Sequence, residues 1–158
     1  MIPIEGATVV FERLIRAALD RYPKWYVNAA RVAKIVISNS PDVKANIAQM
    51  EHGSRILYVW PGIGDLLQKA LGHELAHGCD DNFGSPHYFS STPEWIRIHR
   101  EQAYFDIDKY RDEPLEYLAD MCTKLFLLGP QKLSITNPNE VTFISTWMFP
   151  TLMKEFSK

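Results

Sequence analysis

The chain has 158 residues and a formal charge of −2 at pH 7, and 46% of its residues are hydrophobic. This length and composition predict a soluble globular protein with a single domain over residues 1–158. The near-neutral charge argues against nucleic acid or an anionic membrane as a partner, and every apolar run falls short of the roughly 18 residues of a membrane span.

The N-terminus, MIPIEGATVVFERLIR, contains an early acidic residue and no uninterrupted apolar core before a small-residue cleavage site. It does not resemble a secretory signal, so we expect a cytoplasmic protein by default. Signal-less export or delivery into a target cell stays open. The two cysteines, Cys79 and Cys122, do not make a disulfide framework. We expect free buried thiols, and one bridge in an oxidising compartment is the alternative.

Residues 1–60 predict a helix followed by strands. Apolar side chains at helical spacing mark a helix over residues 9–21, which Tyr22-Pro23 ends. Its predicted apolar stripe comprises Val10, Phe11, Leu14, Ile15, Ala18 and Leu19. Three β-rich runs follow, RVAKIVISNS, VKANIAQMEH and SRILYVWP, with a hairpin turn at His52-Gly53 between the last two. These runs predict a small, mixed sheet.

Residues 61–158 predict a mainly helical part. Asp65 is the candidate N-cap of a helix that runs to about residue 78. The segment TPEWIRIHREQAYF predicts a second helix, with Thr92 as its cap and Pro93 in its first position.

The next segment, DEPLEYLADMCTKLFLLGP, predicts the longest helix, which begins at Asp112 or Glu113 and ends at Gly129. A shorter helix over NEVTFISTWMF is predicted to break at Pro150. The predicted fold class is α+β, with a small mixed β-sheet packed on the helix of residues 65–78 and a mainly helical C-terminal part.

The segment ALGHELAHGCDD, residues 70–81, contains the motif HExxH. His73 and His77 lie four residues apart, so on a helix they share one face and can present two nitrogens to one ion. Glu74 lies about 100 degrees round the helix, near such an ion without having to ligate it. Leu66 and Ala70 lie on the same face and make it an apolar stripe. Two histidines buried in such a stripe need hydrogen-bond partners for their ring nitrogens, and a shared ion would meet that need. An ordinary amphipathic helix is the alternative.

A catalytic zinc site needs a third protein ligand and keeps one position for water. The metzincin pattern HExxHxxGxxH is excluded, because Asp80 and Phe83 occupy its glycine and histidine positions. The segment EPLEYLAD offers Glu116 as a ligand, and Asp120 could accept a hydrogen bond from the far nitrogen of His73. The rival third ligands are Glu113, His52, His87 and His99. A solvated acidic helix face is the alternative.

HELAHGCDD followed by EYLAD resembles the peptidase domain of anthrax lethal factor and its relatives, including the secreted Pro-Pro endopeptidases, all of them gluzincins. The likeness covers about residues 54–126 and implies a minimal zincin-like fold. By position, the resemblance implies His73, His77 and Glu116 as ligands of one zinc ion per chain, with Glu74 as general base.

In that family a tyrosine shortly before the third ligand donates a hydrogen bond to the oxyanion. Tyr110 matches it most closely, although it lies six residues before Glu116 where the relatives have seven, and Tyr104 is the fallback. The resemblance therefore implies Tyr110 as a second catalytic residue.

These features predict a zinc-dependent endopeptidase that binds an extended peptide or protein substrate along an edge strand, for which ANIAQMEH is the candidate. Four aromatic residues are predicted either to wall the cleft or to belong to the core, namely Phe83, Tyr88, Phe89 and Trp95. One alternative is a cytoplasmic regulatory metallopeptidase acting on one protein partner. Another is a non-catalytic zinc-binding interaction module, whose closed site would need a further ligand such as His87 or Cys79. The sequence carries no indication of oligomeric state.

Overall fold

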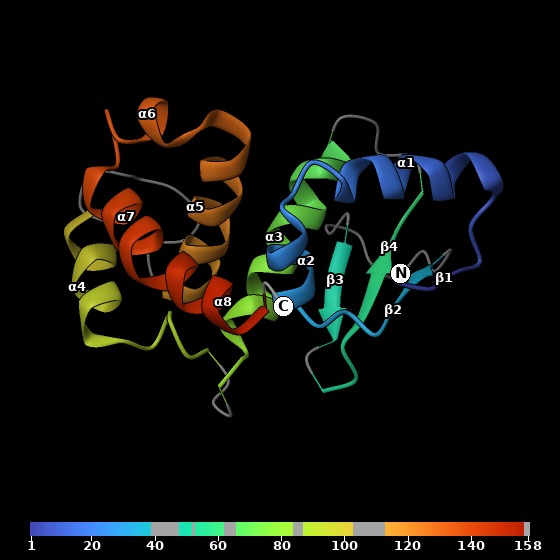
Figure 1. The fold of residues 1–158 in the computed structure, drawn as a ribbon, viewed down its shortest axis with the longest axis horizontal. Helices are drawn as coiled ribbons and strands as arrows, with labels where there is room; N and C mark the ends of the chain where they lie inside the picture. The colour runs from blue at the N-terminus through green and yellow to red at the C-terminus, as the bar shows by residue number, and fades with distance from the viewer. Residues whose placement is uncertain (39–47, 52, 62–65, 84–86, 103–112, 157–158) are drawn as a thin grey trace.

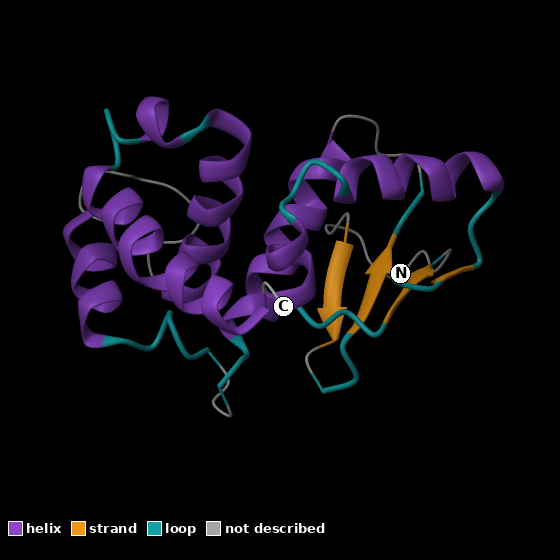
Figure 2. Ribbon diagram, in the orientation of Figure 1, coloured by secondary structure: helices purple, strands orange, loops and turns teal. Residues whose placement is uncertain are grey.

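A small sheet with three helices forms one half of the molecule, and further helices form the other half (Figure 1). The computed structural model describes residues 1–38, 48–51, 53–61, 66–83, 87–102 and 113–156. Strands occur only in the N-terminal half of the described chain (Figure 2). This arrangement confirms the predicted α+β class. No helix in the described segments is both long and apolar enough to cross a bilayer.

The sheet has the strand order β1-β2-β4-β3. Its strands are β1 (Ile4–Glu5), β2 (Lys34–Ile37), β3 (Ala48–Glu51) and β4 (Ile56–Val59). β2 runs parallel to β1 and to β4, whereas β3 runs antiparallel to β4. The sheet is therefore mixed and β3 lies at its edge, as predicted. β1 was not predicted, because two residues are too few to show an alternating pattern.

Alternate residues of the strands face the helices. Along β3, Ala48 and Met50 are buried while Gln49 and Glu51 are exposed. This period of two is the geometry of a pleated strand with one covered face. The buried face of the sheet comprises Ile35, Ala48, Met50, Leu57 and Val59.

α1 (Val9–Leu19) confirms the first predicted helix, and Thr8 Oγ1 caps it by accepting a hydrogen bond from the Phe11 N–H at 3.2 Å. The predicted apolar stripe is wrong in part, because Val10 and Leu14 are 69% and 54% exposed. The helix packs through the part of that stripe that carries Ile15, Ala18 and Leu19. α2 (Lys24–Ala29) was not predicted, since six residues are too short to establish a helical period.

α3 (Leu66–Asp80) carries HExxH and confirms the predicted helix, although Leu66 is exposed and does not extend a buried stripe. Gly72 and Gly78 flank the motif and allow two close contacts. A Cβ atom at Gly72 would lie 2.1 Å from the Tyr22 hydroxyl oxygen, and one at Gly78 would lie 2.5 Å from the Ala30 carbonyl oxygen. The segment around α2 therefore packs directly on the backbone of α3.

The second half begins with α4 (Pro93–Gln102) and α5 (Pro114–Leu128), both predicted. Thr92 caps α4, since its Oγ1 accepts a hydrogen bond from the Trp95 N–H at 3.3 Å. α6 (Pro130–Leu133), α7 (Pro138–Phe143), the π-helical turn η1 (Ile144–Met148) and α8 (Phe149–Phe156) complete the chain. The single turn of α6 was not predicted.

Pro150 does not end the C-terminal helix, contrary to the prediction. α7, η1 and α8 follow one another without interruption, and Pro150 is the second residue of α8. The Phe149 N–H donates to the Ile144 carbonyl, five residues back. A π-turn changes the hydrogen-bond register at the point where proline lacks a donor, so the helix continues past it.

A cluster of aromatic rings joins the two halves. The rings of Tyr26 and Phe126 lie 4.6 Å apart, and those of Phe126 and Phe149 stack at 4.9 Å. These contacts connect α2 with α5 and α8. Such ring pairs stabilise by about 0.5–1.5 kcal/mol each beyond the area they bury. They fix how α5 lies relative to the sheet half and therefore to α3.

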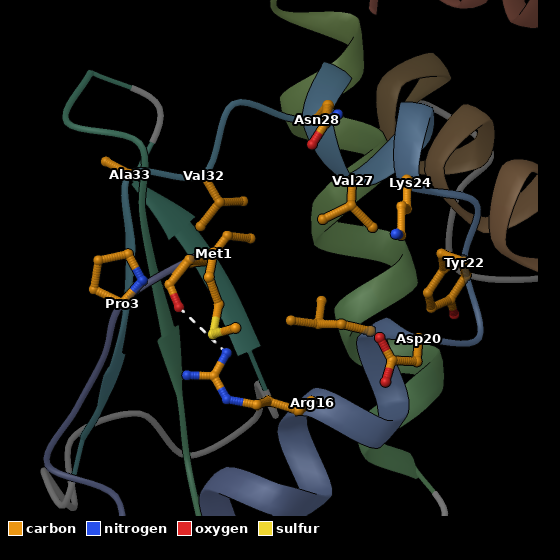
Figure 3. Close-up of a pocket in the computed structure, with 12 residues that line it drawn as sticks. Met1, Pro3, Arg16, Asp20, Tyr22, Lys24, Val27, Asn28, Val32 and Ala33 are labelled. Carbon is orange, nitrogen blue, oxygen red and sulfur yellow. Dashed lines mark hydrogen bonds between the residues drawn. The ribbon is translucent and has the colours of Figure 1, made fainter. Parts of the chain in front are cut away.

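A hollow of about 520 Å³ lies beside α1, α2 and the N-terminal segment (Figure 3). Its walls include Val27, Val32 and Tyr22. Arg16 also lines it, and the Arg16 guanidinium donates a hydrogen bond to the Ile2 carbonyl at 3.5 Å. None of the predicted site residues lines this hollow.

Replacing Gly78 with alanine should lower the free energy of unfolding by about 1–3 kcal/mol, because of overpacking against the Ala30 backbone. The sign is informative, since alanine at an unhindered helix position would instead stabilise by about 1 kcal/mol. Gly53→Ala is the matched control, because nothing lies within 4 Å of a Cβ atom there. Urea unfolding of both variants measures the difference, and equal stabilities would contradict this packing.

Candidate metal centre

Three predicted ligands meet where α3 faces α5. Glu116 lies in the first turn of α5, and its Oε2 is 2.8 Å from His73 Nε2. Its Oε1 is 3.3 Å from His77 Nε2. The ligand atoms of the three residues all lie within 4.8 Å of one another. The group could therefore hold a metal ion.

The separations suit a tetrahedral ion. Ligand atoms about 2.0–2.1 Å from a tetrahedral zinc lie roughly 3.3 Å from each other. The observed 2.8 Å and 3.3 Å between the Glu116 oxygens and the two imidazole nitrogens are close to this value.

The charges within the group keep the Glu116 carboxylate in its ligating form. Hydrogen bonds from His73 and His77 lower the pKa of Glu116 far below its usual range, against the effect of partial burial. The pKa of His77 is raised overall. Burial alone would lower it, but the hydrogen bond with Glu116 and the carboxylates nearby have the larger combined effect. These carboxylates are those of Glu74, Glu116 and Asp80. Glu116 is consequently ionised, which is the form in which a carboxylate binds a metal.

The first turn of α5 is held by its neighbours. Trp95 Nε1 donates to the Pro114 carbonyl at 2.8 Å, and the Tyr117 hydroxyl donates to Glu140 Oε1 at 2.6 Å. Glu140 is fully buried. Glu113, at the N-cap, makes no side-chain capping bond, so these contacts with α4 and α7 fix the turn that carries Glu116.

The C-terminal end of α3 is held just as firmly. Arg55 donates to the carbonyls of Gly78 and Asp81, both at 2.9 Å. Asn82 Nδ2 donates to the Ala29 carbonyl at 2.7 Å and to the Cys79 carbonyl at 3.0 Å. These bonds satisfy carbonyls that a helix end leaves open, and they fix the turn after His77.

Asp80 ties the next segment to this helix end. Its buried carboxylate accepts hydrogen bonds from the backbone N–H groups of Phe89 and Ser90 at 2.6 Å and 2.9 Å. Burial raises the pKa of Asp80, although these bonds and the Ser90 hydroxyl oppose the rise. The sequence placed Asp80 beside the motif but did not predict this structural role, because its partners lie nine and ten residues away.

Glu74 lies beside the group and points to the edge of the sheet. Its Oε2 accepts a hydrogen bond from the Met50 N–H at 2.6 Å. Burial raises the pKa of Glu74, and the two histidines and the Met50 N–H offset only part of that rise. Glu74 therefore holds a partly buried carboxylate beside the candidate ligands.

Of the rival ligands in the described segments, none joins the group. Glu113 is exposed at the start of α5, and His87 Nδ1 lies 3.5 Å from Asp81 Oδ1. His99 is buried on α4, with its ring 5.4 Å from that of Tyr117. His52, Tyr104 and Tyr110 lie outside the described residues.

Both cysteines are free, buried thiols. Cys79 Sγ donates to the Tyr26 carbonyl at 3.5 Å, and Cys122 Sγ lies 3.7 Å from Met148 Sδ. Burial raises the pKa of each thiol well above its usual value. Neither cysteine belongs to the group of candidate ligands among the described residues.

Asp120 is buried on α5, only 7% exposed. Its carboxylate lies 2.6 Å from Lys124 Nζ and 3.9 Å from Lys69 Nζ. Asp120 is therefore covered and paired with lysine, whereas the Glu116 side chain on the same face is 30% exposed. The predicted hydrogen bond from His73 to Asp120 stays a prediction.

The four aromatic residues predicted either to wall the cleft or to belong to the core divide into two pairs. Phe89 and Trp95 are fully buried and belong to the core, which answers the open alternative for these two. Phe83 and Tyr88 are 41% and 36% exposed, and their rings lie 5.1 Å apart. Only the second pair is available at the surface.

The donor set defines what the group can bind. No protein-family model, curated protein or solved structure matches this chain. Two imidazole nitrogens and one carboxylate oxygen suit zinc and other divalent transition metals. Within the described residues the group has these three members, one short of a closed four-ligand site.

Glu116→Ala should weaken zinc binding roughly 100-fold or more, because it removes the charged ligand. Glu113→Ala, three residues earlier and exposed, is the matched control and should bind zinc like the wild type. Competition with a chromophoric chelator measures both affinities. Zinc retained by Glu116→Ala, or lost by Glu113→Ala, would show that the third ligand is wrongly assigned.

Proposed function

We propose that this protein is a zinc-dependent endopeptidase with a minimal zincin-like fold of the gluzincin type. The observation that carries the proposal is the three-donor group His73, His77 and Glu116 with the Glu74 carboxylate beside it. A site that served only to hold an ion would have no use for a further carboxylate at that position.

The residues have distinct roles in this reaction. A zinc ion bound here would act as a Lewis acid, lowering the pKa of its water ligand to about 7 and polarising the scissile carbonyl. Glu74 would accept the proton of the attacking water and deliver it to the leaving amine. Burial of Glu74 raises its pKa above the usual value, which makes its carboxylate a stronger base. Tyr110 remains our candidate for the oxyanion donor.

The substrate would be a peptide or protein segment in extended form. β3 lies at the edge of the sheet and next to Glu74, so a peptide added along this strand would pass the base. Backbone hydrogen bonds to an edge strand bind peptides with little dependence on side chains. A single dedicated protein substrate is compatible with the same site.

A non-catalytic zinc-binding module is the second candidate. The observation in its favour is that the ligands come from both halves, two from α3 and one from α5. An ion there would stabilise the folded state by about 2.7 kcal/mol at 100 times its dissociation constant, with or without catalysis. Activity, not stability, separates the two functions.

Glu74→Gln should keep its zinc and lose peptide cleavage by about 100-fold to 10,000-fold, because it removes only the proton acceptor. The assay incubates zinc-loaded protein with a peptide library and identifies products by mass spectrometry. Glu51→Gln, an exposed carboxylate on the same edge strand, is the control and should cleave like the wild type. A zinc-loaded wild type that cleaves nothing would favour the non-catalytic module.

A further inference from the structure

The free edge of β3 presents backbone groups that β4 does not use. In β4, the Val59 carbonyl accepts a hydrogen bond from the Ser38 N–H, on the side of β2. Backbone groups alternate in direction along a strand, so those of Leu57, two residues earlier, also face β2. Leu57 is the partner of Met50 in the antiparallel pair. Met50 therefore directs its N–H and C=O away from β4, out of the sheet edge.

The Glu74 side chain meets this outward N–H. The distance of 2.6 Å between Met50 N and Glu74 Oε2 is short, as expected for an ionised acceptor. Glu74 is half-buried and stands between His73 and His77 in the sequence. Its other oxygen, Oε1, accepts no hydrogen bond from the described residues. One oxygen is thus engaged by the sheet and the other is left for a reacting proton.

We propose that the backbone N–H of Met50 is the positioning group for Glu74, an inference that rests on the proposed endopeptidase function. A glutamate side chain has three rotatable bonds and loses considerable rotamer freedom when it is fixed. The hydrogen bond from Met50 selects one arrangement before substrate arrives. Preorganised groups of this kind avoid the cost of orientation during the reaction.

The same bond sets which edge groups a substrate can use. Because Glu74 occupies the Met50 N–H, a peptide strand on this edge pairs with the outward Met50 C=O and with the outward groups of Ala48. β3 thus binds the peptide and orients the base at the same residue. The position of the substrate chain and the position of the Glu74 carboxylate are therefore both set by the backbone of Met50.

Amide hydrogen exchange of the full-length protein tests the contact without any substrate. The Met50 amide should exchange at least about tenfold faster in Glu74→Ala than in the wild type, since a bond to a charged acceptor is lost. Glu74→Gln keeps an oxygen acceptor and should retain most of the protection. The Ala48 amide, which faces the same edge, is the internal control. An unchanged Met50 exchange rate in Glu74→Ala would overturn the proposal.

Kinetics test the positioning role on the peptide that the wild type cleaves best in the library assay. Met50→Pro removes the N–H together with a buried side chain, so Met50→Ala, which keeps the N–H, is its reference. Relative to Met50→Ala, Met50→Pro should lower kcat about tenfold or more with zinc content and KM retained, since an edge strand tolerates proline. Ala48→Pro makes the same change two residues away and should raise KM without lowering kcat. Equal losses of kcat in both variants would overturn the proposal. A wild type that cleaves no peptide would overturn the endopeptidase function instead, independently of the exchange result.

Discussion

The packing of α3 against α5 is the constraint on which the site depends. His73 and His77 come from one half of the molecule and Glu116 from the other, so the group exists only while these helices stay in register. Ala119 and Thr123 are small and buried, and they follow Glu116 by three and seven residues, so they share its face of α5. The Thr123 hydroxyl donates to the Ala119 carbonyl within the same helix. A larger side chain at either position would move the carboxylate away from the imidazoles.

Each of the two helices is fixed by elements that do not themselves touch the ligands. Glycines at 72 and 78 let the segment around α2 pack on the backbone of α3, while Arg55 closes its C-terminal end. Trp95 and Glu140 hold the first turn of α5. The geometry of the candidate site therefore depends on contacts throughout the core, and not on the ligand residues alone.

Much of the site could be predicted because its signals are local. His73 and His77 share a helix face by their spacing alone, and Glu116 follows a proline-marked helix start. The supporting residues could not be predicted in this way. Met50 acts through a backbone N–H that carries no residue signature, and Glu140 meets Tyr117 across 23 positions of sequence.

The fold shows the same division between local and tertiary effects. β2, β3, β4 and the long helices were predicted by periodicity, whereas the exposure of Val10 and Leu14 depends on which face of α1 meets the core. The C-terminal helix continues past Pro150 because of a π-turn, which no local sequence pattern predicts. Sequence patterns therefore predict the longer elements, and tertiary packing determines which faces of them are buried.

We propose that His73, His77 and Glu116 bind zinc and leave one coordination position for water. X-ray absorption spectroscopy at the zinc edge of the loaded wild-type protein measures this coordination shell. We expect a four-coordinate shell of two imidazole nitrogens and two oxygens at about 2.0–2.1 Å. A sulfur neighbour at about 2.3 Å, or a shell without imidazole scattering, would contradict it.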